Sequence, residues 1–252
     1  MVGHGHRGIF ELVPGQYTDD SIAGLNEALF AQAFCSGNAR RTGRLAPKPT
    51  GADLSFGVED FLVVTIGRGV GMGIVLNGQL YRGKHGGAGE IGHTVLDPDG
   101  PLCGCGNRGC LETYVSDPHL LRMAAEAAAQ GALRGEVATV EDLLALARDG
   151  DHAAQAIYAQ VGEKLGRTIA NLINALNPTL IIISGEGMRA ADFIVESLHA
   201  TIDRHVMPGL AGDADVRIDL MSDDAWARGA ASLVLQELFK TPFYRTATAS
   251  LR

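Results

Sequence analysis

The stretch TLIIISGEG at residues 179–187 decides the fold class, because it joins an apolar run to a glycine turn. Residues 179–183 form a strand rich in β-branched side chains, and a helical pattern follows from about Ala190 to His205. A strand, a glycine turn and a helix in this order are typical of α/β proteins, which place ligands at the carboxyl ends of their strands. The sequence therefore predicts an α/β fold.

A second buried strand is predicted at residues 61–66, because the run FLVVTI is apolar and β-branched throughout. Asn77 and Gly78 form a strong hairpin signal between strands expected at residues 74–76 and 79–82. We therefore expect an antiparallel unit whose first turn is lined by glycines, namely Gly67, Gly69, Gly71 and Gly73.

Helical patterns occupy most of the chain after residue 116. Asp117 and Pro118 can start one helix, Thr139 can cap a second through a capping box, and Asp151 can cap a third. The predicted ranges are helices at 117–130, from 139, at 152–176 and at 224–239, a short strand at 216–221, and an irregular tail at 241–252. Residues 2–12 could hold a strand and residues 21–34 a helix, whereas residues 36–57 show no usable period.

Composition excludes several functional classes. The chain has 252 residues, a formal charge of −8 and a pI near 5.4, which disfavour binding to nucleic acid because phosphates require a basic face. No run of 18 apolar residues and no signal peptide are visible, so we expect a cytoplasmic protein that does not span a membrane. Clustered cysteines in such a chain favour metal ligation over disulfides.

Three of the four cysteines lie within eight residues, and a histidine precedes them by ten positions. His93, Cys103, Cys105 and Cys110 make a complete tetrahedral ligand set for zinc, with no position left open for water. The alternative is a reduced, metal-free thiol cluster. Glu90 and Glu112 bracket the set, so the same loop would present two carboxylates.

These residues carry a family resemblance. The pattern E-x-G-H at residues 90–93, followed by C-x-C-G-x-x-G-C-L-E at residues 103–112, resembles the signature of the ROK family of repressors, open reading frames and sugar kinases. TIGRGVG at residues 65–71 resembles its second phosphate-binding segment, and residues 180–187 resemble its adenosine-side segment. The resemblance covers residues 58–239. It implies an actin-like, ribonuclease-H-like fold in two lobes, usually assembled as a homodimer or tetramer.

The resemblance also implies residue roles. His93 and the three cysteines would bind structural zinc, and Glu90, His93 and Glu112 would face the hydroxyls of a hexose or amino sugar. Paired carboxylates suit sugar hydroxyls, since they accept charge-assisted hydrogen bonds. Both acids could instead be surface groups or partners of the zinc ligands. In a kinase, five glycines would bind ATP, namely Gly67, Gly69, Gly71, Gly185 and Gly187. The same glycines could instead serve only to form tight turns.

Departures from the family pattern favour a regulator. No Asp-x-Gly-Gly-Thr phosphate loop occurs, and residues 38–50, where a kinase carries its general base, hold no acid. Asp53 is the only carboxylate between Glu27 and Glu59, and it lacks the family context, so no catalytic residue is assigned. A DNA-binding helix-turn-helix is missing too. Because family-like sequence resumes abruptly at Val58, we expect residues 1–57 to be a divergent or truncated remnant, leaving an incomplete N-terminal lobe.

We therefore predict that residues 58–252 form a zinc-containing, sugar-sensing effector domain of a ROK-type transcriptional regulator. The alternative is an ATP-dependent sugar kinase of the glucokinase type. A third possibility is a remnant that keeps structural zinc and binds no ligand.

Overall fold

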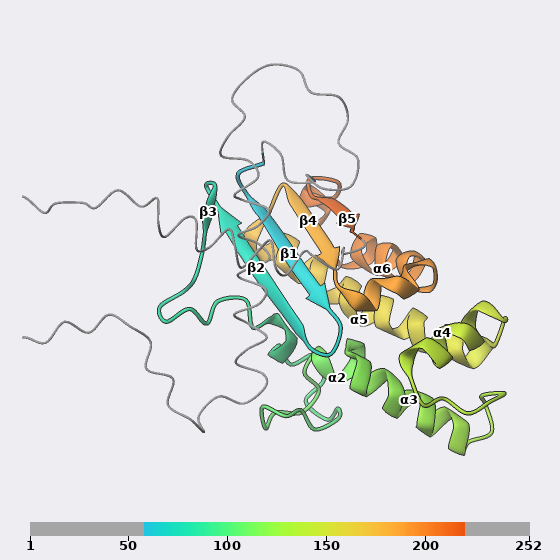
Figure 1. Cartoon of the computed structure of the whole chain (residues 1–252). Helices are drawn as coiled ribbons and strands as arrows, with labels where there is room; N and C mark the ends of the chain where they lie inside the picture. Colours follow the sequence, from blue (N-terminus) through green and yellow to red (C-terminus); the bar gives the residue numbers. More distant parts are fainter. Residues whose placement is uncertain (1–57, 220–252) are drawn as a thin grey trace, which may run out of the picture.

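The computed structural model describes residues 58–219, in which a mixed sheet runs through the centre with helices packed on it (Figure 1). The strand order is β3-β2-β1-β4-β5. β1 pairs with β4 in parallel and with β2 in antiparallel orientation, and β4 pairs with β5 in parallel. The strands are β1 Phe61–Ile66, β2 Val70–Leu76, β3 Gln79–Leu80, β4 Leu180–Ser184 and β5 Asp215–Ile218.

The connection from β3 to β4 carries a loop and four α-helices, and one further α-helix joins β4 to β5. Figure 1 shows α5 and α6 side by side behind the sheet, with α3 and α4 beyond the end of β1. The α-helices are α2 Glu112–Val115, α3 Asp117–Ala129, α4 Val140–Arg148, α5 His152–Leu176 and α6 Ala191–His205. The 3-10 helices are η1 Ile91–His93, η2 Glu186–Ala190 and η3 Pro208–Leu210.

Strand β1 is buried along its whole length, as its unbroken apolar run predicts. Leu62, Val64 and Ile66 share one face and join the core formed with the helices. Phe61 and Val63 point to the opposite face and are also buried. The central strand therefore has no solvent-facing side, which explains why it does not alternate between apolar and polar residues.

The residues that predict a hairpin turn and two helix caps adopt those structures. Asn77 and Gly78 both adopt positive φ, at 52° and 69°, as a two-residue hairpin turn requires. Thr139 and Asp142 form the predicted capping box of α4. The side chain of Asp151 accepts hydrogen bonds from two backbone N–H groups at the start of α5.

Some boundaries differ from the prediction. β2 begins at Val70 rather than at residue 74, because residues 70–73 pair with residues 63–66 of β1. β3 ends at Leu80, β5 spans 215–218, and η2 precedes α6. The helices η1 and α2 were not predicted, because helices of three and four residues are too short to show a helical period in the sequence. The expectations for residues 2–12, 21–34, 224–239 and 241–252, for Asp53, and for the incomplete N-terminal lobe lie outside the described residues.

Helices α5 and α6 approach closely at two glycines of α5, Gly162 and Gly166. A Cβ atom at Gly162 would overlap the Ile194 carbonyl oxygen and the Ser197 hydroxyl of α6, and one at Gly166 would lie 2.6 Å from the Leu198 carbonyl oxygen. The absence of side chains there lets the two backbones pack together against the sheet.

We expect Gly162→Ala to lower the free energy of unfolding by about 1–3 kcal/mol, because the added methyl group forces the two helices apart. Chemical denaturation with circular dichroism measures this change. Gly87→Ala is the matched control, since nothing lies within 4 Å of a Cβ atom at that position. Equal stability of the two variants would contradict the close packing of α5 on α6.

Candidate metal centre and the neighbouring crevice

The predicted metal ligands lie on a loop whose own backbone hydrogen bonds fold it into a compact knuckle. The Leu111 N–H donates to the Thr94 carbonyl oxygen at 2.9 Å, and the Cys103 N–H donates to the Asn107 carbonyl oxygen at 2.8 Å. Gly109 adopts a φ of 63°, and a Cβ atom there would overlap the Asp97 carbonyl oxygen. The fold of the loop therefore depends on glycine at this position.

All four predicted ligands converge. One ligand atom from each of His93, Cys103, Cys105 and Cys110 lies within 4.8 Å of the other three. The Cys105 and Cys110 sulfurs are 3.7 Å apart, and Cys103 Sγ lies 3.5 Å from His93 Nδ1. A tetrahedral zinc ion with ordinary bond lengths separates two sulfur ligands by about 3.8 Å, and a sulfur from a nitrogen by about 3.6 Å. The four donors therefore fit zinc and leave no coordination position open.

The ionisation of the three thiols differs between the buried and the exposed positions. Burial raises the pKa of the Cys110 thiol to about 12, and burial also raises the pKa of Cys103. The backbone N–H of Asn107 is the main cause that lowers the pKa of Cys105, which is exposed. A divalent cation bound by the three sulfurs would hold them as thiolates, so its binding would release protons.

Glu90 lies on the outer side of the histidine ligand. The Nδ1 atom of His93 faces the cysteines, and its Nε2 atom lies 4.0 Å from Glu90 Oε2. The Glu90 side chain is 42% exposed and that of His93 is 21% exposed. A carboxylate and a ring nitrogen are thus presented together to solvent at the rim of the metal centre.

Glu112 begins α2, two residues after the last cysteine. The Val70 N–H donates to Glu112 Oε2 at 3.2 Å, which ties this carboxylate to the first residue of β2. The Glu90 segment reaches the same strand end, because a Cβ atom at Gly92 would overlap the Val70 carbonyl oxygen. The carboxylate of Glu112 and the backbone that follows Glu90 therefore both lie against the start of β2.

The two glycine segments meet at the carboxyl ends of β1 and β4. Gly185 has a φ of 100°, and a Cβ atom there would overlap the Ile66 backbone. Gly187 lies against Ile66 as well, and a Cβ atom at Gly67 would lie 3.6 Å from Glu186 Oε2. Gly69 lies instead on the Glu112 side of the β1–β2 turn. Gly71 is outside the turn, because it pairs with Thr65 inside the sheet.

Beside these glycines the structure brings together charged residues whose roles the sequence did not indicate. The Asp117 N–H donates to the Gly67 carbonyl oxygen at 2.8 Å, which sets the start of α3 against the β1–β2 turn. Arg189 pairs with Glu141 at 2.7 Å and with Glu186 at 3.9 Å. The sequence could have indicated two of them by their position. Glu186 lies within the glycine segment at residues 180–187, and Asp117 follows the cysteine block at residues 103–112 by five positions.

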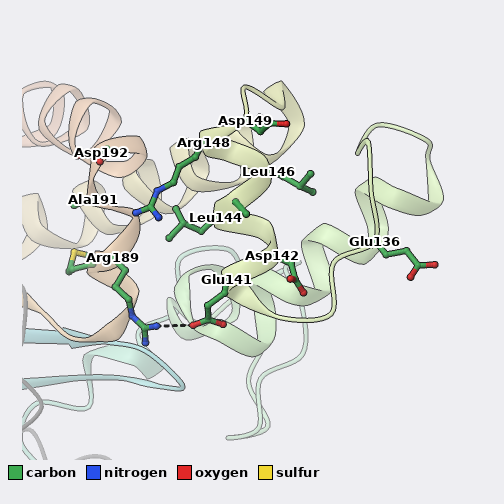
Figure 2. Close-up of a pocket in the computed structure, with 12 residues that line it drawn as sticks. Glu136, Glu141, Asp142, Leu144, Leu146, Arg148, Asp149, Arg189, Ala191 and Asp192 are labelled. Carbon is green, nitrogen blue, oxygen red and sulfur yellow. Dashed lines mark hydrogen bonds and ion pairs between the residues drawn. The ribbon is translucent and has the colours of Figure 1, made fainter.

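Glu141 and Arg189 also line a groove between α4 and the η2–α6 segment, with a volume of about 1070 Å³ (Figure 2). Figure 2 shows Arg189 and Glu141 pointing toward each other across it, with Asp149 at the far end of α4. Acids outnumber bases along its wall; the charged residues are Glu136, Glu141, Asp142, Asp149, Asp192, Arg148 and Arg189. A smaller crevice, lined by Asp117, Tyr158 and Glu186 among others, shares Glu141 and Arg189 with the groove.

Within residues 58–219, every helix is too short or too polar to cross a membrane.

Comparison with known proteins identifies relatives of both regulatory and enzymatic types. A profile described as the ROK family matches residues 49–237. A glucokinase of Halalkalibacterium halodurans is 37% identical over 190 residues, covering 72% of this chain and 58% of its own length. The DNA-binding transcriptional dual regulator NagC of Escherichia coli is 34% identical over 180 residues, covering 70% of this chain and 44% of its own length.

A solved ROK family transcriptional regulator, a homologue of the Escherichia coli MLC protein, superposes with a TM-score of 0.70 at 31% identity, covering 84% of this chain and 51% of that chain. The structural neighbours confirm the predicted actin-like α/β fold. The chain spans less than two thirds of the length of the curated relatives that it matches.

Proposed function

The chain belongs to the ROK family, and from this premise we propose that it is a zinc-containing, sugar-sensing effector domain of a transcriptional regulator. Hexoses and amino sugars are the proposed effectors. Assembly as a homodimer or tetramer, a cytoplasmic location and the assignment of residues 58–252 to one sugar-binding domain are predictions that accompany this proposal.

The observation that carries the proposal is the position of two carboxylates on the metal loop. Glu90 stands beside the outer nitrogen of His93, and Glu112 stands at the start of β2, only two residues after Cys110. Sugar hydroxyls donate well to such carboxylates, and the His93 ring can add a further polar contact. Bound zinc would supply rigidity, so that these groups are held in place before the sugar arrives.

A sugar kinase is the second candidate, and one observation favours it. Gly67, Gly185 and Gly187 lie together at the carboxyl ends of two parallel strands, where α/β proteins bind phosphorylated ligands. The sequence argues against this candidate, because residues 38–50 contain no carboxylate to remove a proton from the sugar. Without that proton acceptor, phosphoryl transfer loses one of its required groups.

An assay of ADP release separates the two functions. The zinc-loaded chain is incubated with ATP, magnesium and each member of a panel of hexoses and N-acetylhexosamines. We expect no release above the rate without sugar. Sugar-dependent release at about 1 per second or faster, which is ordinary for kinases, would overturn the regulator assignment in favour of the kinase.

A further inference from the structure

Ser116 stands between α2 and α3 and does not act as an ordinary helix cap. It occupies the N-cap position of α3, where a serine hydroxyl usually accepts a hydrogen bond from the first turn, yet it makes no such bond. The hydroxyl instead donates to the Glu112 carbonyl oxygen at 3.0 Å, and the Ser116 N–H donates to the same oxygen at 3.2 Å. Ser116 is buried. Its side chain therefore stabilises α2, which carries Glu112, rather than the helix that it precedes.

His119 holds the Ser116 hydroxyl in this arrangement. The Nδ1 atom of His119 lies 2.8 Å from the hydroxyl oxygen. A hydroxyl group has one hydrogen, which goes to the Glu112 carbonyl oxygen because a carbonyl can only accept. The ring of His119 must then donate from Nδ1. Burial lowers the pKa of His119, followed by the charge of Arg122, so the ring is neutral near pH 7 with its proton on Nδ1.

Glu112 is thereby held at both its backbone and its side chain. Its carbonyl oxygen accepts the two hydrogen bonds from Ser116, and its carboxylate oxygen Oε2 accepts from the Val70 N–H at 3.2 Å. Helix α2 has only four residues, too few to keep a helical shape through their own hydrogen bonds. The direction of the Glu112 carboxylate therefore depends on contacts from outside α2.

A second contact from α3 supports the same turn. Arg122 donates from Nη2 to the Thr113 carbonyl oxygen at 3.3 Å. The Asp117 N–H, which would bond to this oxygen in a continuing helix, donates to the Gly67 carbonyl oxygen instead. Because His119 and Arg122 are three positions apart, they lie on one face of α3. This face supplies donors to the turn that carries Glu112, directly from Arg122 and through Ser116 from His119.

We propose that Ser116 and His119 are positioning residues that hold Glu112 in the orientation in which its carboxylate accepts hydrogen bonds from a sugar. His119 acts through the Ser116 hydroxyl. This inference rests on the proposed function for the identity of the ligand, whereas the orientation of Glu112 can be measured without a ligand.

Amide hydrogen exchange at Val70 measures that orientation in the zinc-loaded protein. We expect exchange to be about fivefold faster in Ser116→Ala and in His119→Leu than in the wild type, because the Val70 N–H loses its fixed acceptor. His119→Asn should change the rate less than about twofold, since its amide nitrogen can take the place of Nδ1 and donate to Ser116. The double variant Ser116→Ala/His119→Leu should exchange no faster than Ser116→Ala, because His119 acts through the hydroxyl that is already gone.

Calorimetric titration of the same proteins with a sugar that binds the wild type measures the consequence for binding. We expect His119→Leu to weaken sugar binding at least about fivefold and His119→Asn to weaken it less than about twofold. The matched control is His199→Leu, which makes the same chemical change at an exposed position of α6. It should leave both the sugar affinity and the exchange at Val70 unchanged.

Val70 exchange or sugar affinity equal to the wild type in His119→Leu would overturn the proposal. Equal losses in His119→Leu and His119→Asn would overturn it too, because the packing of the ring would then account for them. A wild type that binds none of the hexoses and N-acetylhexosamines would overturn the proposed function, and the exchange at Val70 would then show separately whether Ser116 and His119 hold Glu112.

Discussion

Replacing Cys110 by serine is expected to remove zinc from the chain and to abolish sugar binding. Cys110 is fully buried and lies 3.7 Å from Cys105, so a serine hydroxyl in its place is a far weaker ligand in an otherwise closed set. The wild type should carry about one zinc ion per chain, and the variant under about a tenth of that amount, when both are measured by atomic emission after dialysis.

Loss of the ion should also loosen residues 93–112, because residues 94–102 and 104–108 are exposed or only partly buried. We expect the free energy of unfolding to fall by about 3 kcal/mol or more. Cys35→Ser makes the same chemical change at the one cysteine outside the block, and it should leave the zinc content unchanged. Cys110→Ser protein that retains a full equivalent of zinc would show that the ligand set is wrong.

Glu112→Gln is expected to weaken the binding of the sugar by roughly 10- to 150-fold, since a hydrogen bond to a charged group contributes about 1.5–3 kcal/mol. The amide oxygen can still accept from the Val70 N–H, so the local fold and the zinc content should be preserved. Isothermal titration with a sugar that binds the wild type measures the change.

Glu126→Gln is the control for the loss of a carboxylate, because Glu126 lies on α3 and pairs with Arg122 at the surface. Its effect on sugar affinity should be less than about twofold, as exposed ion pairs contribute little. If Glu112→Gln binds sugar as tightly as the wild type while it keeps its zinc, Glu112 is not a sugar contact.

Local signals predicted the parts of the fold that depend on neighbours in sequence. The apolar runs at residues 61–66 and 180–183 became the central strands, and Asn77 with Gly78 became the expected turn. The start of β2 was missed because its glycines resemble a turn, and only pairing with β1 reveals them as strand residues. That pairing is a tertiary contact, which glycine content cannot indicate.

In the candidate site too, residues that are close in sequence were predicted and residues from separate segments were not. The convergence of His93 and the three cysteines was predicted from their residue types and spacing, because one short loop contains all four. The crevice acids were not, because Asp117, Glu141 and Glu186 come from three separate segments. The parallel pairing of β1 with β4, the contact of Asp117 with Gly67 and the ion pair of Glu141 with Arg189 bring them together.

Calorimetric titration of the zinc-loaded chain with hexoses and N-acetylhexosamines shows whether the loop of residues 90–112 forms a sugar site. We predict saturable binding of at least one of these sugars, at about one site per chain, and loss of that binding when a chelator removes the zinc. If folded, zinc-loaded protein gives no binding heat with any sugar of the panel, the chain is not a sugar-sensing domain.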